Sequence, residues 1–143
     1  MKKAVLFFSA FILSLASFAQ EKTVTVNDVI KFNETVFDFG KIKQGVPVYH
    51  DFVFTNISAN PIVIESAVPS CGCTTPVKPE GAVPKGKENK IIAGFNAANP
   101  GPFNKSITVK VAGIDVPIQL IIKGEVVVPD SGATKDQAPK PKS

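Results

Sequence analysis

The sequence of 143 residues contains no tryptophan and no arginine, and it has one histidine, one methionine and two cysteines. Without arginine the chain lacks the planar side chain that binds phosphate groups and guanine bases through two hydrogen bonds at once. Its 16 basic residues are therefore all lysines, and they are scattered along the chain. We expect no nucleic acid among its partners.

The amino-terminal segment holds a short apolar run between two lysines and a site with small residues. The run covers Ala4 to Leu15, and Ser17 and Ala19 supply small residues at the two positions that determine cleavage of a signal peptide. A membrane-spanning helix needs about 20 apolar residues, more than this run supplies. We expect a signal peptide over residues 1–19, a mature chain without a membrane span that begins at Gln20, and a periplasmic or secreted location.

The mature chain has the composition of a small β-protein. Cleavage removes two lysines and leaves 14 against 12 acidic residues. About 100 residues remain between the signal peptide and a polar tail, which is enough for a single core. β-branched and aromatic residues, together with 12 prolines and 10 glycines, favour sheets and turns over helices.

Alternation of apolar and polar residues predicts the strands. Within residues 48–56, His50, Phe52 and Phe54 occupy alternate positions and therefore lie on one face of the strand. Pro117 favours an edge strand or a bulge near the start of the last expected strand. The residues from Pro76 to Lys90 are rich in proline, glycine and charge and are expected to form a surface loop. The expected strands are Thr23–Val26, Thr35–Gly40, Val48–Asn56, Ile62–Glu65, Lys90–Phe95, Ser106–Val111 and Val116–Ile122.

These patterns predict an all-β fold, a single immunoglobulin-like β-sandwich of about seven strands. We expect residues 20–34 to form an amino-terminal strand or linker and residues 35–128 to form the sandwich. Residues 129–143 have almost no apolar side chains and are expected to be a disordered tail.

Cys71, Gly72 and Cys73 interrupt the series of strands and hold both cysteines. In an oxidising compartment such a pair is read first as a disulfide. Residues i and i+2 of an extended strand lie about 6.6 Å apart, at the outer limit for a disulfide, so the bond requires a turn at Gly72, where glycine supplies the φ angle needed. A ring this small removes little entropy from the unfolded chain.

Several motifs recur in one known family. They are Phe37-Asp38-Phe39-Gly40, then Gly45, His50 with Phe52 and Phe54, Asn56, Ser70 to Thr75 with the two cysteines, Ile91 with Phe95, and Ile122 to Val126. From Phe37 to Val126 the chain resembles a family of exported bacterial proteins known as domain of unknown function 1573. The resemblance implies an immunoglobulin-like sandwich of the Hydin and major sperm protein type, and it implies no biochemical activity.

Four interpretations of the cysteine pair remain open. It is a turn-locking disulfide or a pair of quiet thiols, part of a ligand or partner surface, a site of thiol–disulfide exchange, or a metal site in which Cys71, Cys73 and His50 bind copper or zinc. A zinc site would lack a fourth strong ligand, because the mature chain offers no second histidine. His50 itself is more often a packed ring at the margin of a core than a ligand.

No Gly-x-Ser-x-Gly, phosphate-binding loop or His-Glu-x-x-His pattern occurs. We therefore expect an exported, non-enzymatic binding or scaffold module without a cofactor, whose partner is another exported protein. Its candidate binding site comprises Cys71, Gly72, Cys73, Thr74 and His50. The alternative is a periplasmic thiol protein that acts in disulfide exchange or binds copper through Cys71 and Cys73. The ligand and the oligomeric state are not predicted by the sequence.

Overall fold

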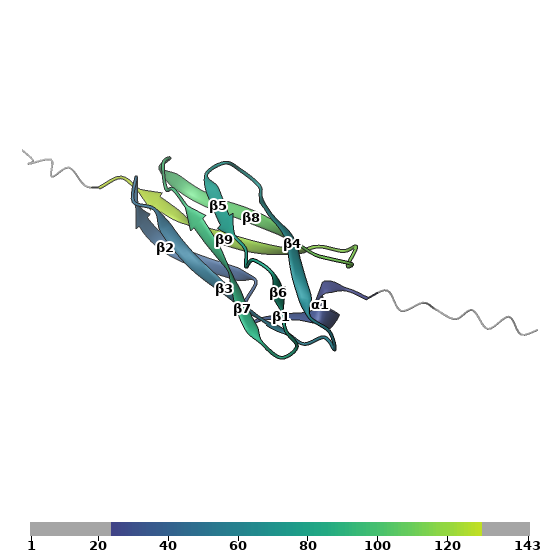
Figure 1. The fold of residues 1–143 in the computed structure, drawn as a ribbon. Coiled ribbons are helices and arrows are strands. Elements are labelled where there is room, and N and C mark those ends of the chain that lie inside the picture. Colours follow the sequence, from purple (N-terminus) through teal and green to yellow (C-terminus); the bar gives the residue numbers. More distant parts are fainter. Residues whose placement is uncertain (1–23, 130–143) are drawn as a thin grey trace, which may run out of the picture.

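A computed structural model describes residues 24–129, which form a sandwich of two β-sheets with one short helix (Figure 1). Within these residues helix α1 (Val26–Val29) comes first and is followed by nine strands. The strands are β1 (Ile30–Phe32), β2 (Val36–Lys43), β3 (Val48–Asn56), β4 (Ile62–Pro69), β5 (Thr74–Val77), β6 (Ala82–Val83), β7 (Glu88–Phe95), β8 (Gly101–Val111) and β9 (Ile118–Val127). The all-β sandwich predicted from the sequence is confirmed.

The four-stranded sheet has the order β1-β3-β7-β5. β3 alternates as predicted, so Phe52 and Phe54 are fully buried while Tyr49 and Asp51 face solvent. β7 pairs antiparallel with β3 and places Ile91 opposite Phe52. Apolar residues of the two central strands thus meet on one face of the sheet, and the other face stays open.

The five-stranded sheet has the order β2-β9-β8-β4-β6. β2 runs parallel to β9, and the other pairs are antiparallel. Alternate side chains of β8 and β9 form the inner rows, with Ile107 opposite Leu120. These rows pack against Phe52, Phe54 and Ile91 of the other sheet in one hydrophobic cluster. Each such side chain contributes about 1.5–3 kcal/mol through its removal from water, so the core between the sheets holds the fold together.

Two sequence-based boundaries are corrected by strand pairing. The surface loop expected from Pro76 to Lys90 contains the end of β5, all of β6 and the start of β7. β5 pairs with β7 and β6 pairs with β4. Pairing with a neighbouring strand therefore orders residues whose own proline-rich and charged composition disfavours strand.

Strand predictions near both ends of the described chain are also corrected. Val26 begins α1, which the Asp28 carboxylate supports by accepting a hydrogen bond from the Thr25 N–H (2.9 Å); the strand follows at β1. β1 pairs with β3, so the sandwich starts before residue 35. Pro117 lies just before β9, a central strand that pairs with β8 without a bulge, so it occupies neither the edge strand nor the bulge expected for it. Val116 is half exposed.

The signal peptide expected over residues 1–19 lies outside the described residues, as does the tail from residue 130 onward. Within residues 24–129, the structure contains no helix that is long and apolar enough to cross a membrane.

Candidate functional site

The Cys-Gly-Cys segment forms the corner at which the chain leaves β4 of one sheet and enters β5 of the other. Cys71 and Cys73 are joined by a disulfide, with their Cα atoms 5.4 Å apart. An extended strand would separate these atoms by about 6.6 Å. The turn expected at Gly72 is therefore present, and the disulfide spans it.

Backbone hydrogen bonds fasten the corner to both sheets. The Asn96 N–H donates to the Cys73 carbonyl (3.1 Å), and the Ser70 N–H donates to the Ser106 carbonyl (2.8 Å). Within the turn, the Thr74 N–H donates to the Cys71 carbonyl (3.3 Å). Because Asn96 directly follows β7 and Ser106 belongs to β8 of the other sheet, the corner bridges the two layers.

Gly72 occupies the tip of the turn, and its surroundings differ from the expectation. The spacing of the two cysteines predicts a backbone angle at Gly72 that only glycine adopts readily. Gly72 is absent from the glycines with positive φ, and a Cβ atom built on it would meet no atom within 4 Å. The turn thus tolerates a side chain here, and the tip is open to approach from solvent.

Thr74 connects the corner to the interior. Its residue surface is 3% exposed, and its Oγ1 lies 3.7 Å from the Cys71 Sγ. Since Cys71 has no thiol hydrogen in the disulfide, the Thr74 hydroxyl is the donor of this weak contact. Thr74 therefore belongs to the corner together with the two cysteines.

His50 lies between the sheets and away from the corner. Its imidazole stacks on the Phe37 ring with centroids 3.6 Å apart, and its side chain is 15% exposed. Nε2 lies 3.2 Å from the Glu34 Oε1, within ion-pair distance, but the geometry does not satisfy a hydrogen bond. The packed ring expected at the margin of the core is what the structure shows.

The strand register separates His50 from the cysteines. Thr74 pairs with Phe95 of β7, and Phe95 pairs with Val48 of β3. His50 is therefore two strands across and two residues along from Thr74, about 12 Å with regular sheet spacings. Ligands of one metal ion lie far closer together than this, so the structure does not bring His50 and the sulfurs into one site.

No group of three residues suited to hold a metal ion occurs within residues 24–129. Each sulfur is bonded to the other, and a metal binds the thiolate form of cysteine. Copper binding through Cys71 and Cys73 would therefore require reduction of the disulfide.

A groove that the sequence did not predict lies on the outer face of the four-stranded sheet. It has a volume of about 550 Å³. Tyr49 is 70% exposed and Val77 is 54% exposed, so two large apolar side chains border the groove. The groove is lined chiefly by Pro47, Tyr49, Thr75, Val77, Ile92 and Gly94.

A glycine opposite Tyr49 shapes the floor of this groove. Gly94 pairs with Tyr49 across the strands. A Cβ atom at Gly94 would lie 3.0 Å from the Tyr49 Cε1, so the tyrosine ring lies directly over the glycine. Thr75, the first β5 residue in the groove, follows Cys73 by two positions, so the disulfide corner begins one wall of the groove.

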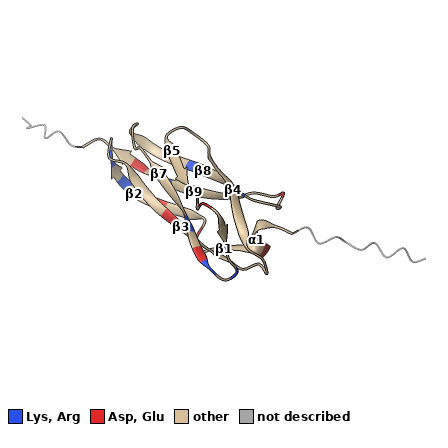
Figure 2. Ribbon diagram, viewed as in Figure 1, with Lys and Arg blue, Asp and Glu red and all other residues tan. Residues whose placement is uncertain are grey.

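Charged side chains of both signs are spread over the strands (Figure 2). Ion pairs neutralise several of them, including Lys90 with Asp51, Lys110 with Glu65 and Lys123 with Asp38. Asp51 at the rim of the groove is one of these paired residues, so the groove is mainly an apolar surface.

Known structures share this fold at low sequence identity. A PapD-like (ASH) domain of human CEP192 matches with a TM-score of 0.61 and 9% identity, over 82% of this chain and 99% of that domain. A protein of unknown function from Porphyromonas gingivalis W83 matches with a TM-score of 0.59 and 14% identity, over 68% of this chain and 46% of that one. A family 123 glycoside hydrolase from Clostridium perfringens matches with a TM-score of 0.56 and 12% identity, over 72% of this chain and 26% of that one.

The chain thus spans less than half the length of the two bacterial chains, and these likenesses show the fold alone. A comparison with curated proteins finds no match. Residues 30–126 match the family described as "Protein of unknown function (DUF1573)", which confirms the resemblance noted in the sequence. With more than half of its residues matched and an immunoglobulin-like fold, the chain belongs to the DUF1573 family.

Proposed function

We propose that the chain is an exported, non-catalytic binding module that accepts apolar side chains of another exported protein in the groove beside the Cys-Gly-Cys corner. The observation that carries this proposal is the hollow of about 550 Å³ between Tyr49 and Val77. Binding pockets for small ligands and side chains usually measure about 300–1,000 Å³. The groove therefore has room for a few apolar side chains.

The groove is built on a rigid support. Its residues come from three paired strands, and the opposite faces of β3 and β7 are buried in the core. Such a surface loses little conformational freedom when it binds. Tyr49 adds a large amphipathic ring, and tyrosines of this kind often carry much of the binding free energy at interfaces.

Side-chain contacts fit this surface better than addition of a strand to the edge of β5. The Cys73 carbonyl points toward the β7 side, where it accepts a hydrogen bond from the Asn96 N–H. Backbone groups of successive residues in a strand point alternately to its two sides, so the N–H positions of residues 74 and 76 face away from β7. The Thr74 N–H is already bonded to Cys71, and Pro76 has no N–H. The free edge of β5 thus offers a partner strand no donor at these two positions.

The position of His50 supports a non-catalytic role. It is the single histidine of the chain, and its ring is stacked on Phe37 between the sheets. General base catalysis requires the base to lie within hydrogen-bond reach of the reacting proton. A ligand in the groove occupies the outer face of the sheet, on the side away from this ring.

Selection from a random peptide library displayed on phage tests the proposal. We expect the chain to enrich peptides that carry apolar or aromatic residues. Tyr49→Lys should weaken their binding about tenfold or more, because it removes a central aromatic contact. Val116→Lys is the matched control, since Val116 is also exposed but lies in the connection between β8 and β9. Peptides that bind wild type and Tyr49→Lys equally well would overturn the proposal.

A further inference from the structure

A lysine on the inner face of β8 lines the same hollow as one cysteine of the disulfide. Lys105 is directly opposite the buried Ile122 of β9. Residues opposite each other in an antiparallel pair point to the same side of the sheet, so Lys105 belongs to the inner row. The other members of this row are apolar and buried: Phe103, Ile107, Val109 and Val111. Lys105 is thus the exception in a row that otherwise builds the core.

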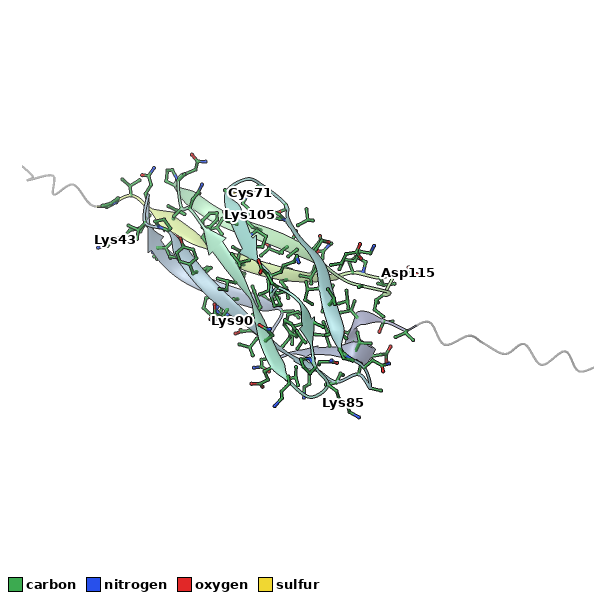
Figure 3. All side chains as sticks on the ribbon, in the orientation of Figure 1. Lys43, Cys71, Lys85, Lys90, Lys105 and Asp115 are labelled. Carbon is green, nitrogen blue, oxygen red and sulfur yellow. A yellow bond between two sulfur atoms is a disulfide. The ribbon has the colours of Figure 1, made fainter. Side chains whose placement is uncertain are left out.

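Lys105 is half-buried, and it makes no ion pair or side-chain hydrogen bond with any residue in the range 24–129. It lines a small hollow of about 120 Å³ together with Cys73. Figure 3 shows Lys105 and Cys71 at the same end of the sandwich, with Lys85 at the other end. A lysine without a counter-ion among the described residues therefore lines the same hollow as Cys73 of the disulfide.

The two sulfurs differ in their surroundings. Cys73 packs against the hydrophobic core, whereas Cys71 is not among the residues that do so. Gly72 between them is exposed, and Cys71 and Cys73 are both partly buried. Because only Cys73 is held against the core, we take Cys71 as the sulfur that receives an incoming thiolate and Cys73 as the sulfur that would leave.

We infer that the Cys71–Cys73 disulfide is an exchange site for a protein dithiol, with Lys105 placed to stabilise the departing Cys73 thiolate. A thiolate of the dithiol attacks the Cys71 Sγ, the S–S bond breaks, and Cys73 leaves with the electron pair beside the ammonium group. The second thiol of the partner then attacks the mixed disulfide and releases Cys71. The protein gains two electrons and two protons, and the partner becomes a disulfide.

General chemistry supports this assignment. A nearby cation favours a thiolate, and a better leaving thiolate speeds exchange. The Thr74 hydroxyl, 3.7 Å from the Cys71 Sγ, can donate to the second thiolate. A ring closed between residues i and i+2 removes little entropy from the unfolded chain, so the bond is not needed as a major staple of the fold. This inference is independent of the groove and of its proposed occupant.

Equilibration with a mixture of equal amounts of reduced and oxidised thioredoxin tests the inference. We expect at least half of the chain to become reduced, as alkylation and mass spectrometry would show. A disulfide with the potential of a purely structural bond would remain about nine-tenths oxidised or more, and this result would overturn the inference.

Variants at position 105 test the role of the cation. Lys105→Met should slow reduction by thioredoxin roughly threefold or more, the effect of losing one partly exposed charge interaction. Lys105→Arg should restore the rate, and Lys85→Gln, which removes a positive charge at the other end, should leave it unchanged. Equal rates for wild type and Lys105→Met would refute the placement of Lys105 as a positioning residue.

A thioredoxin whose second cysteine is replaced by serine can trap the mixed disulfide. Peptide mapping should locate it at Cys71. Trapping at Cys73 would contradict the assigned direction of attack. A chain that still binds the selected peptides but does not exchange with thioredoxin would refute the exchange site and leave the groove proposal intact.

Discussion

Removal of the disulfide should destabilise the chain only modestly. In the double variant Cys71→Ser, Cys73→Ser the bond that spans three residues is lost. The chain-entropy relation for so short a loop gives about 1.6 kcal/mol. The hydrogen bonds from Asn96 and Thr74 to the corner use backbone atoms and remain available, so no further large loss is expected.

Urea unfolding followed by circular dichroism measures this difference. The free energy of unfolding falls by about 1–3 kcal/mol for each molar increase in urea. The urea concentration at the midpoint of unfolding should therefore fall by about 0.5–1.5 M in the double variant. Ile107→Ala, in the fully buried inner row, is the reference and should cost about 2–5 kcal/mol. A double cysteine variant that is less stable than Ile107→Ala, or that does not fold, would refute the conclusion that the core between the sheets holds the fold.

Three further predictions concern single positions. Gly124→Ala should lower the free energy of unfolding by about 1–3 kcal/mol, because an added Cβ would lie 2.7 Å from the Gly40 carbonyl oxygen. Gly72→Ala should leave this free energy unchanged within about 0.5 kcal/mol. Thermal unfolding compares the two variants, and equal losses of stability would contradict the geometry. His50→Phe should keep the stack on Phe37 and remove a buried nitrogen that makes no hydrogen bond. The free energy of unfolding should therefore stay the same or rise by about 1 kcal/mol. A large loss would show that the nitrogen has a required partner. Mass spectrometry of the exported chain should give a first residue at Gln20, and an intact residue 1 would disprove signal cleavage.

The inner rows could be predicted from the sequence because alternation of side chains reports directly on burial. Phe52, Phe54, Ile91 and Ile107 are buried as expected. β5 and β6 could not be predicted in this way, since their four and two residues contain proline or are too short to show a period. Their order comes from pairing with distant strands, which local patterns do not encode.

The candidate site was predicted in part. The two cysteines, the turn and Thr74 come together in one corner, because they are neighbours in the sequence. The groove was missed because outward residues of β3, β5 and β7 are ordinary in type and meet only through the register. The position of Lys105 could have been predicted, because it precedes Ile107 by two residues and alternation therefore places it on the inner face. It was missed because the strand was expected to begin at Ser106.

Site-specific photo-crosslinking tests the proposed binding module most directly. A photo-reactive phenylalanine analogue replaces Tyr49 in one strain and Val116 in another, in cells that export the chain. We expect one discrete protein adduct from position 49. It should be absent from position 116 and lost when Ile92→Asp places a charge in the groove. Adducts of equal yield from both positions, or an adduct at position 49 that persists with Ile92→Asp, would contradict it.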